Sequence, residues 1–329
     1  MLWEDTVAQL TAVEICAGAG GQALGLEQAG FRHAAAVELD PDACETLRRN
    51  RGDEWKIVED DVATIDGRAY AGVDLLAGGV PCPPFSIAGK QLGRDDDRDL
   101  FPQALRLVAE ARPRAVLLEN VRGLGTCRFE GYRAQVLGRL GELGYRAWWD
   151  LVSASDHGVP QLRPRFVLVA VALAWAPAFR WPEPLDPRPA TVGETLADLM
   201  ASRGWPGAAA WAARADGIAP TIVGGSKKHG GPDLGPTRAR AAWRELGVDG
   251  LGIADCPPGP DHPDGLAPKL TVRMVARLQG FPDSWQFAGR KTAAYRQVGN
   301  AFPPPVARAL GTAIARALAD FPDPPGLRS

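Results

Sequence analysis

Short apolar runs alternate with longer amphipathic segments along the first half of the chain. The runs predict strands at residues 11–15, 33–39, 55–62, 73–79, 115–121, 146–155 and 165–173, and the segments between them predict helices at 22–30, 40–50, 100–113 and 131–144. Apolar strands separated by helices are typical of a mostly parallel sheet with both faces covered by helices. We therefore expect an α/β fold.

The alternation ends near residue 175. Prolines and glycines dominate from there to about residue 268, which predicts a second, smaller and irregular domain with few periodic segments. Regular patterns return at 270–281 and 303–321. In the last segment Val306, Leu310, Ile314 and Leu318 recur every four residues. This spacing predicts an amphipathic helix that packs back on the first domain.

Composition restricts the classes of protein. The 329 residues are 46% hydrophobic, enough for a large core, and the net charge of -2 excludes a chain that is basic throughout. The five cysteines are odd in number and include no C-x-x-C pair, which argues against a disulfide framework and against a zinc site. The N-terminal stretch is acidic, and the longest apolar run, 166–179, is too short to span a bilayer. We expect a cytoplasmic protein with reduced thiols, no metal and no membrane contact.

The first chemical signal is the turn "ICAGAGG" after the first predicted strand. Gly18, Gly20 and Gly21 would let the backbone approach a ligand at the carboxyl end of that strand. The turn lacks the G-x-G-x-x-G spacing of a pyrophosphate site. Tight packing of helix on strand explains such glycines equally well, so the turn by itself decides nothing.

Acidic residues follow the next two strands. Glu38 ends the second, where its carboxylate could accept hydrogen bonds from both ribose hydroxyls of a nucleoside, and Asp60 and Asp61 end the third, where either could bind an adenine amino group. A solvated acid at the start of a helix accounts for Glu38 equally well. Taken together, the glycines and acids suit a nucleoside cofactor without a diphosphate, such as S-adenosylmethionine.

The stretch "GGVPCPPFSIAGK" follows the fourth strand. Pro81, Pro83 and Pro84 restrict the backbone around Cys82, and a thiol held in few conformations suits a nucleophile. A buried structural cysteine is the more common fate of a single Cys. The fifth strand ends with Glu119, which would share an edge of the sheet with Cys82 if the two strands are neighbours.

In "QLRPRF", Gln161, Arg163 and Arg165 alternate along an extended segment, so both guanidinium groups face one side. Two aligned arginines can hold a carboxylate, a carbonyl oxygen or a phosphate.

These residues carry a resemblance to a known family. The segments "AVEICAGAGGQALGLEQAGF", "VELDPDA", "GGVPCPPFSIAGKQLGRDDDRDLF", "LLENVRGL", "QLRPRF", "LTVRMVARLQGFPDSW" and "YRQVGNAFPPPVARALG" resemble, in order, the motifs of the DNA (cytosine-5)-methyltransferases. The resemblance covers the chain except about residues 175–268. It implies a Rossmann-like, S-adenosylmethionine-dependent domain at 1–180, completed by 293–329, and a target recognition domain at 181–292.

The resemblance assigns catalytic roles. Cys82 matches the nucleophile that adds to cytosine C6 and thereby activates C5 for methyl transfer. Glu119 matches the acid that contacts N3 and the exocyclic amine, Arg165 the arginine on the carbonyl oxygen, and Arg163 a support close to the nucleophile. Because C6 is shielded inside a duplex, the base must be flipped out of the stack.

The resemblance also implies a cofactor site. Its residues would be Cys16, Gly18, Gly20, Gly21, Glu38, Asp61, Val62, Leu100 and Asn300. Two positions depart from the family pattern. Cys16 stands where many members have a phenylalanine that contacts the adenine, and Pro83 stands where many have glutamine after the nucleophile; we expect neither departure to abolish activity.

The implied partner is double-stranded DNA. The segment from Ser86 onward resembles the family's mobile loop, which closes over the flipped base. Between residues 203 and 244 the charge is +5, a pattern that suits phosphates, and solubility alone would also explain it. We expect Lys227, Lys228 and His229, on a glycine-flanked loop, and Arg238 and Arg240 to contact DNA.

By resemblance to stand-alone bacterial modification enzymes, we also expect a restriction endonuclease acting on the same site. Two other functions stay open. A relative of the family methylates cytosine in transfer RNA, and a non-catalytic DNA-binding module could keep the fold, although Cys82, Glu119 and Asn300 are all present.

Overall fold

A seven-stranded sheet organises the chain, and its strands lie in the order β3-β2-β1-β4-β5-β7-β6. The computed structural model describes residues 9–81, 99–186, 189–225 and 231–319. The strands are β1 (Thr11–Ile15), β2 (Arg32–Glu38), β3 (Ile57–Glu59), β4 (Leu75–Gly78), β5 (Ala115–Val121), β6 (Tyr145–Ser153) and β7 (Pro164–Ala172).

The first five strands run parallel, and β7 lies antiparallel between β5 and β6. The predicted mostly parallel α/β sheet is therefore confirmed, as is the neighbourhood of the fourth and fifth strands. Because β7 runs the opposite way, its first residues lie at the edge where the parallel strands end. This reversal brings the start of β7 level with the end of β5, with Arg165 paired to Val121.

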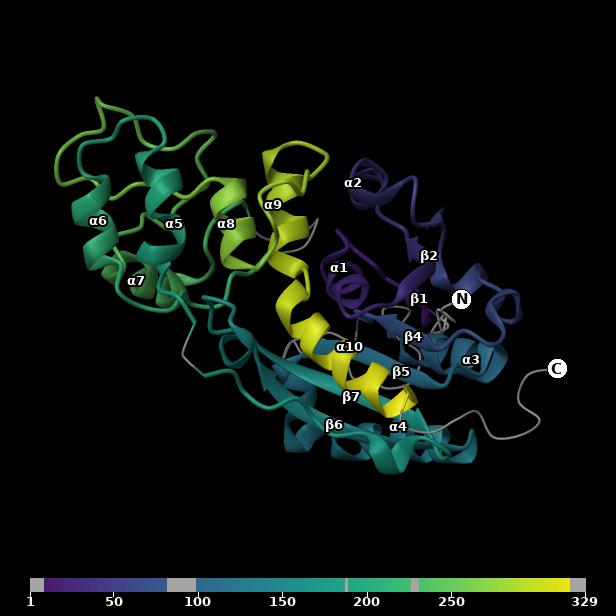
Figure 1. The fold of residues 1–329 in the computed structure, drawn as a ribbon. Helices are drawn as coiled ribbons and strands as arrows, with labels where there is room; N and C mark the ends of the chain where they lie inside the picture. The colour runs from purple at the N-terminus through teal and green to yellow at the C-terminus, as the bar shows by residue number, and fades with distance from the viewer. Residues whose placement is uncertain (1–8, 82–98, 187–188, 226–230, 320–329) are drawn as a thin grey trace, which may run out of the picture.

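Helices cover both faces of the sheet. The helices α1 (Gly21–Gln28) and α10 (Pro304–Ala319) pack on one face, and α3 (Phe101–Ala111) and α4 (Glu130–Glu142) pack on the other. Side chains alternate along β5, so that Leu117 contacts the first pair of helices and Leu118 the second. Figure 1 shows α10 lying across the sheet beside α1. Its predicted stripe of Val306, Leu310, Ile314 and Leu318 is buried against the sheet, which confirms the expected helix.

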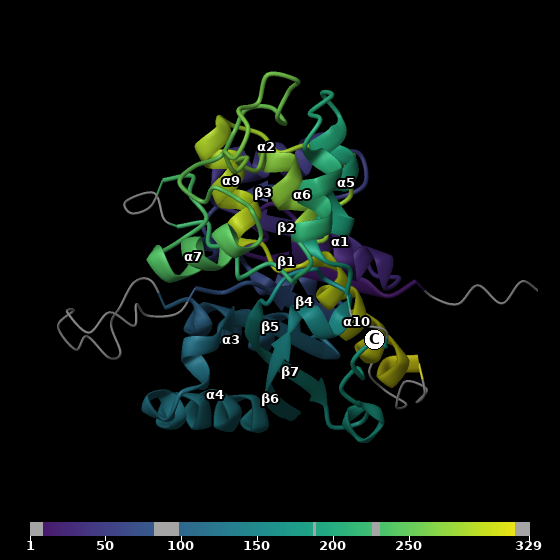
Figure 2. The ribbon, with the colours of Figure 1, turned by 90° about the vertical axis from the view of Figure 1, so that its left-hand side faces the viewer.

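The region predicted to be irregular contains more helix than the sequence suggested. It includes α5 (Val192–Ala201), α6 (Ala208–Arg214) and α7 (Thr237–Glu245), which gather to one side of the sheet in Figures 1 and 2. Next to them lie α8 (Val272–Leu278) and α9 (Lys291–Asn300), and α2 (Pro41–Arg51) follows β2. One continuous apolar cluster includes the buried Trp211 and Trp243 and the buried Leu47 of α2. The helices of this region therefore share a core with α2.

The connections contain short 3-10 turns. They are η1 (Val62–Thr64), η2 (Gly67–Tyr70), η3 (Arg122–Gly125), η4 (Cys127–Phe129), η5 (Ala154–His157) and η6 (Ala176–Ala178). The third predicted strand is shorter than expected: β3 ends at Glu59, and the acids that follow it lead directly into η1.

Candidate active site at the carboxyl edge of the sheet

Glu38 is held rigidly at the end of β2. One carboxylate oxygen accepts a hydrogen bond from the backbone N–H of Gly18 at 2.7 Å. The other oxygen accepts from the N–H groups of Leu39 at 2.9 Å and Asp40 at 2.8 Å. Three backbone donors therefore orient this carboxylate, which is a strong acceptor for further hydroxyl donors.

The glycines of the first turn differ in role. Gly18 adopts a positive φ of 54°, and a Cβ atom on it would meet open space beside a cavity that Gly18 lines. At Gly21 a Cβ would lie 2.3 Å from the carbonyl oxygen of Phe302, and at Gly20 it would lie 2.7 Å from a methyl group of Leu47. Gly18 and Gly21 line the cavity, whereas Gly20 permits close packing on α2.

Two adjoining cavities of about 210 and 780 Å³ lie at this edge of the sheet. The larger is lined by most of the residues expected from the sequence: Cys16, Glu38, Asp61, Val62, Leu100, Glu119, Arg165 and Asn300. Four of these, Cys16, Glu38, Glu119 and Asn300, also line the smaller cavity, where Gly18 and Gly21 lie. The structure thus brings together residues that are far apart in the sequence.

An ion pair joins two of these residues. Arg165 Nε lies 2.7 Å from Glu119 Oε1, with side chains only 13% and 11% exposed. Burial lowers the pKa of Arg165, and the carboxylate of Glu119 opposes that shift. Because Glu119 and Arg165 lie on neighbouring antiparallel strands, two residues apart in register, both point toward the same cavity. The pair can present a carboxyl group and a guanidinium group to one planar polar ligand.

The ends of the segment that contains Cys82 are held at the cavity. Asn120 Nδ2 donates to the carbonyl oxygen of Val80 at 2.8 Å, and Leu100 N donates to that of Pro81 at 3.2 Å. Pro81 and Leu100 both line the larger cavity. Cys82 itself and Ser86 lie outside the described residues, so their expected roles stay predictions.

Arg163 occupies a different place from Arg165. It is fully buried, and its guanidinium group donates to the carbonyl oxygens of Ile222 at 2.7 Å, Gly299 at 2.8 Å and Ala301 at 2.9 Å. It lines neither of the two cavities. The structure therefore makes Arg163 a link between β7, the segment before residue 226 and the end of α9, while its expected support of the nucleophile stays a prediction.

Asn300 brings a third segment to the cavity. Its Nδ2 donates to the carbonyl oxygen of Gly225 at 3.2 Å, and both residues line the larger cavity. A Cβ atom on Gly299 would lie 2.4 Å from the Cα of Gly224, so this approach requires glycine on the helix. Reasoning from the sequence missed the role of Gly224 and Gly225, although paired glycines before a basic loop were a visible signal.

Comparison with known proteins shows the family of the chain. The family model of the C-5 cytosine-specific DNA methylase matches residues 10–223 and 235–316. The chain belongs to this family. It is 63% identical to the type II methyltransferase M.NaeI of Lentzea aerocolonigenes over 94% of this chain and 75% of the relative. It is 53% identical to the type II methyltransferase M.NgoMIV of Neisseria gonorrhoeae over 94% and 98% of the two chains.

Solved structures agree on the fold. A DNMT2 mutant of Spodoptera frugiperda matches with a TM-score of 0.64 and 17% identity, over 93% of this chain and 99% of its own. At that identity the likeness concerns the fold alone. The family model shows a DNA methyltransferase, and the likeness in fold agrees with its Rossmann-like α/β sheet.

The structure describes only some of the residues expected to contact DNA. Lys227, Lys228 and His229 lie outside the described residues. Arg238 is exposed at the start of α7, and Arg240 Nη1 lies 3.9 Å from Asp233 Oδ2, so Arg240 has an acidic neighbour.

In the described part of the chain, no group of three or more His, Cys, Asp or Glu residues could hold a metal ion, and no helix is long and apolar enough to cross a membrane.

Arg163→Lys is expected to destabilise the methylase by about 3 kcal/mol, because a lysine ammonium cannot reach three carbonyl oxygens that a guanidinium fork binds and would leave buried acceptors unpaired. Urea unfolding measures this loss. The control is Arg139→Lys, at an exposed arginine paired with Glu142 on α4, and it should change stability by less than about 0.5 kcal/mol. Equal stability of the two variants would contradict the linking role of Arg163.

The cysteines should differ in reactivity. Burial, with the nearby carboxylates of Glu38, Asp61 and Glu14, raises the pKa of Cys16 to about 12, and burial raises that of Cys44 to about 12.

At pH 8 only about one thiol in ten thousand is then ionised at these two sites. Timed alkylation with peptide mass spectrometry should label exposed Cys127 and Cys256 before Cys16 and Cys44. Labelling of Cys16 as fast as Cys127 would show that the thiol is not shielded.

Proposed function

We propose that this methylase transfers a methyl group from S-adenosylmethionine to C5 of a cytosine within a short DNA sequence, as the modification enzyme of a type II restriction-modification system. The observation that carries the proposal is the common edge of the sheet, where the fixed carboxylate of Glu38 and the Glu119–Arg165 pair line adjoining cavities. The names of the two similar bacterial relatives support the restriction-modification context.

The residues present fit the cofactor. Glu38 is oriented to accept hydrogen bonds from a ribose, and Gly18 leaves its side of the smaller cavity open. Asp61 uses one carboxylate oxygen to bind Ala63 N at 2.9 Å, and its second oxygen has no hydrogen-bond partner among the described residues. That oxygen would accept from the adenine amino group beside Val62. S-adenosylmethionine, when bound, supplies the electrophilic methyl group.

The protein's own residues would activate the cytosine. In our proposal Glu119 takes up a proton from solvent when cytosine binds and gives it to N3 as the thiolate of Cys82 adds to C6. No negative charge then builds up on the ring as the C6–S bond forms, and C5 becomes nucleophilic. Arg165, held by Glu119 Oε1, is placed to bind the carbonyl oxygen. After methylation the N3 proton returns to Glu119 and the C5 proton passes to a water molecule. The C6–S bond then breaks, which releases the Cys82 thiolate and restores the aromatic ring.

Residues 181–292 are proposed to read the DNA sequence. The excess of basic residues between 203 and 244 supports this assignment. The contact of Asn300 with Gly225 supports it too, because Gly225, the residue directly before the basic loop, lines the larger cavity. The restriction endonuclease is proposed to act on the same sequence, which methylation would protect.

The test is methyl transfer from labelled S-adenosylmethionine to unmethylated genomic DNA and, in parallel, to total transfer RNA. We expect 5-methylcytosine in DNA within one short motif, located by bisulfite sequencing, and resistance of that DNA to endonucleases that cut the motif. Label only in transfer RNA would contradict the proposed substrate. No transfer to either would leave the binding-only function.

A further inference from the structure

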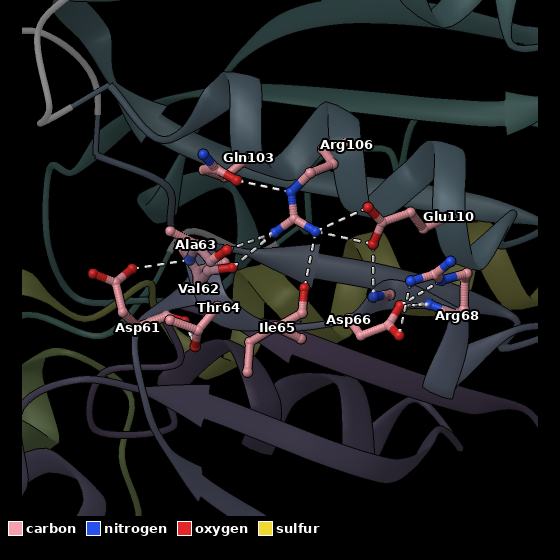
Figure 3. A network of polar contacts seen from close by, with 11 residues as sticks. Asp61, Val62, Ala63, Thr64, Ile65, Asp66, Arg68, Gln103, Arg106 and Glu110 are labelled. Atoms are coloured by element: carbon pink, nitrogen blue, oxygen red, sulfur yellow. Dashed lines mark hydrogen bonds and ion pairs between the residues drawn. The ribbon is translucent and has the colours of Figure 1, made fainter.

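Arg106 of α3 is the centre of a polar network (Figure 3) that includes Asp61 and Val62, two residues that line the larger cavity. Its Nη2 donates to the carbonyl oxygen of Val62 at 3.0 Å, and its Nη1 donates to that of Ile65 at 2.8 Å. Glu110, one turn along the helix, binds Nη1 at 2.9 Å, and Gln103 binds Nε at 2.9 Å. Nη2 also donates to the carbonyl oxygen of Ala63 at 3.4 Å, so the guanidinium group joins one helix to three carbonyl groups of a distant segment.

The segment bound by Arg106, residues 61–67, has no place in the sheet. It consists of η1 and the start of η2, so it makes no ladder hydrogen bonds, and the carbonyl groups of Val62, Ala63 and Ile65 accept from Arg106. Glu110 also binds this segment directly, because its carboxylate accepts a hydrogen bond from the backbone N–H of Gly67 at 2.7 Å. A Cβ atom on Gly67 would lie 2.8 Å from Glu110 Cβ, so the segment packs tightly against α3.

The same segment forms a wall of the larger cavity. Asp61 and Val62 line it, and so does Leu100, the residue that immediately precedes α3. The position of Val62 relative to Leu100 therefore depends on how the segment is held on α3, and Arg106 binds the carbonyl group of Val62 itself.

We propose that Arg106 is a positioning residue that sets the spacing of these two cavity walls and thereby the affinity for the cofactor. This inference rests on the proposed function, because it assumes that the cavity binds S-adenosylmethionine. Arg106 does not line the cavity, and it acts through the backbone of Val62 and Ile65. It should affect binding much more than the chemistry at cytosine.

The effect should be local. The side chains of Val62 and Ile65 are buried in the apolar cluster beneath the sheet, 4% and 8% exposed, so the segment stays attached when the guanidinium group is removed. Arg106 itself is 32% exposed, which limits its share of global stability. Without the guanidinium group, residues 61–67 should become more mobile but stay folded.

The experiment compares Arg106→Ala and Arg106→Lys with the control Arg68→Ala. Arg68 is 78% exposed and paired with Asp66 at the same segment. Its replacement by alanine therefore removes a guanidinium group and leaves the contacts to Val62 and Ile65 intact. Calorimetric titration with S-adenosylmethionine without DNA gives the affinity. Hydrogen exchange of residues 62–67 in the cofactor-free protein measures how readily this segment opens, and steady-state kinetics give KM and kcat.

We expect Arg106→Ala to weaken cofactor binding and raise its KM about tenfold with kcat within about twofold, and to speed exchange at residues 62–67. Arg106→Lys, which can keep one carbonyl contact, should fall between it and the wild type. Cofactor affinity and exchange equal to those of Arg68→Ala, or a loss of kcat at unchanged KM, would overturn the inference. Failure of the wild type to bind S-adenosylmethionine would instead overturn the proposed function.

Discussion

Serine at position 82 is expected to abolish methyl transfer and leave cofactor binding intact. A serine hydroxyl is not ionised near neutral pH and, with no base assigned to it, cannot replace a thiolate in adding to C6. The neighbouring Pro81 lines the larger cavity, whereas the groups that fix Glu38 belong to the first turn and to the two residues that follow β2. Turnover should fall by about 10⁴-fold or more. Labelled-methyl turnover and calorimetric cofactor titration measure the two effects separately.

Two further measurements make this prediction specific. Cys127→Ser, at an exposed cysteine away from both cavities, should keep wild-type turnover. DNA carrying 5-fluorocytosine at the target should accumulate as a covalent complex with the wild type, because fluorine replaces the proton whose loss breaks the C6–S bond. Full turnover by Cys82→Ser, or an equally abundant complex with that variant, would exclude Cys82 as the nucleophile.

Glu119→Gln should lower kcat by about 10³-fold, since glutamine keeps the shape of the side chain but has no acidic proton to give to the cytosine ring. It should also cost about 2 kcal/mol of stability, because Arg165 loses a charged partner 2.7 Å away in a buried setting. Turnover at saturating cofactor and DNA gives the first quantity, and urea unfolding at the same pH gives the second.

The matched control is Glu142→Gln. Glu142 also pairs with an arginine, Arg139 at 2.8 Å, but its side chain is 68% exposed. An exposed pair contributes little, so stability should change by less than about 0.5 kcal/mol and kcat should not change. If Glu119→Gln keeps wild-type turnover, the carboxyl group is not the proton donor and only its pairing with Arg165 matters.

The two arginines of "QLRPRF" have partners that could not be predicted from the sequence. Their alternation predicted both on one extended segment. Arg165 lies on β7 and pairs with Glu119 in the cavity, whereas Arg163, directly before β7, binds three carbonyl oxygens. The partners of Arg163 come from residues 222, 299 and 301. No local pattern predicts such contacts, because they depend on where distant segments meet.

The helices α5, α6 and α7 were missed for a related reason. They are short, and prolines and glycines surround them, so the local signals favour turns. Burial of Trp211 and Trp243 in a shared cluster is consistent with stabilisation of these helices by tertiary packing.

By itself, the sequence determined the class of fold, the residues at strand ends that line the two cavities, and the family motifs, because periodicity and short-range spacing are local properties. Only the tertiary structure decided the order of the strands, the reversal of β7 that pairs Arg165 with Glu119, and the bracing of the cavity wall by Arg106. Each of these depends on packing between residues tens to hundreds of positions apart. Such contacts follow from how the whole chain buries its apolar surface.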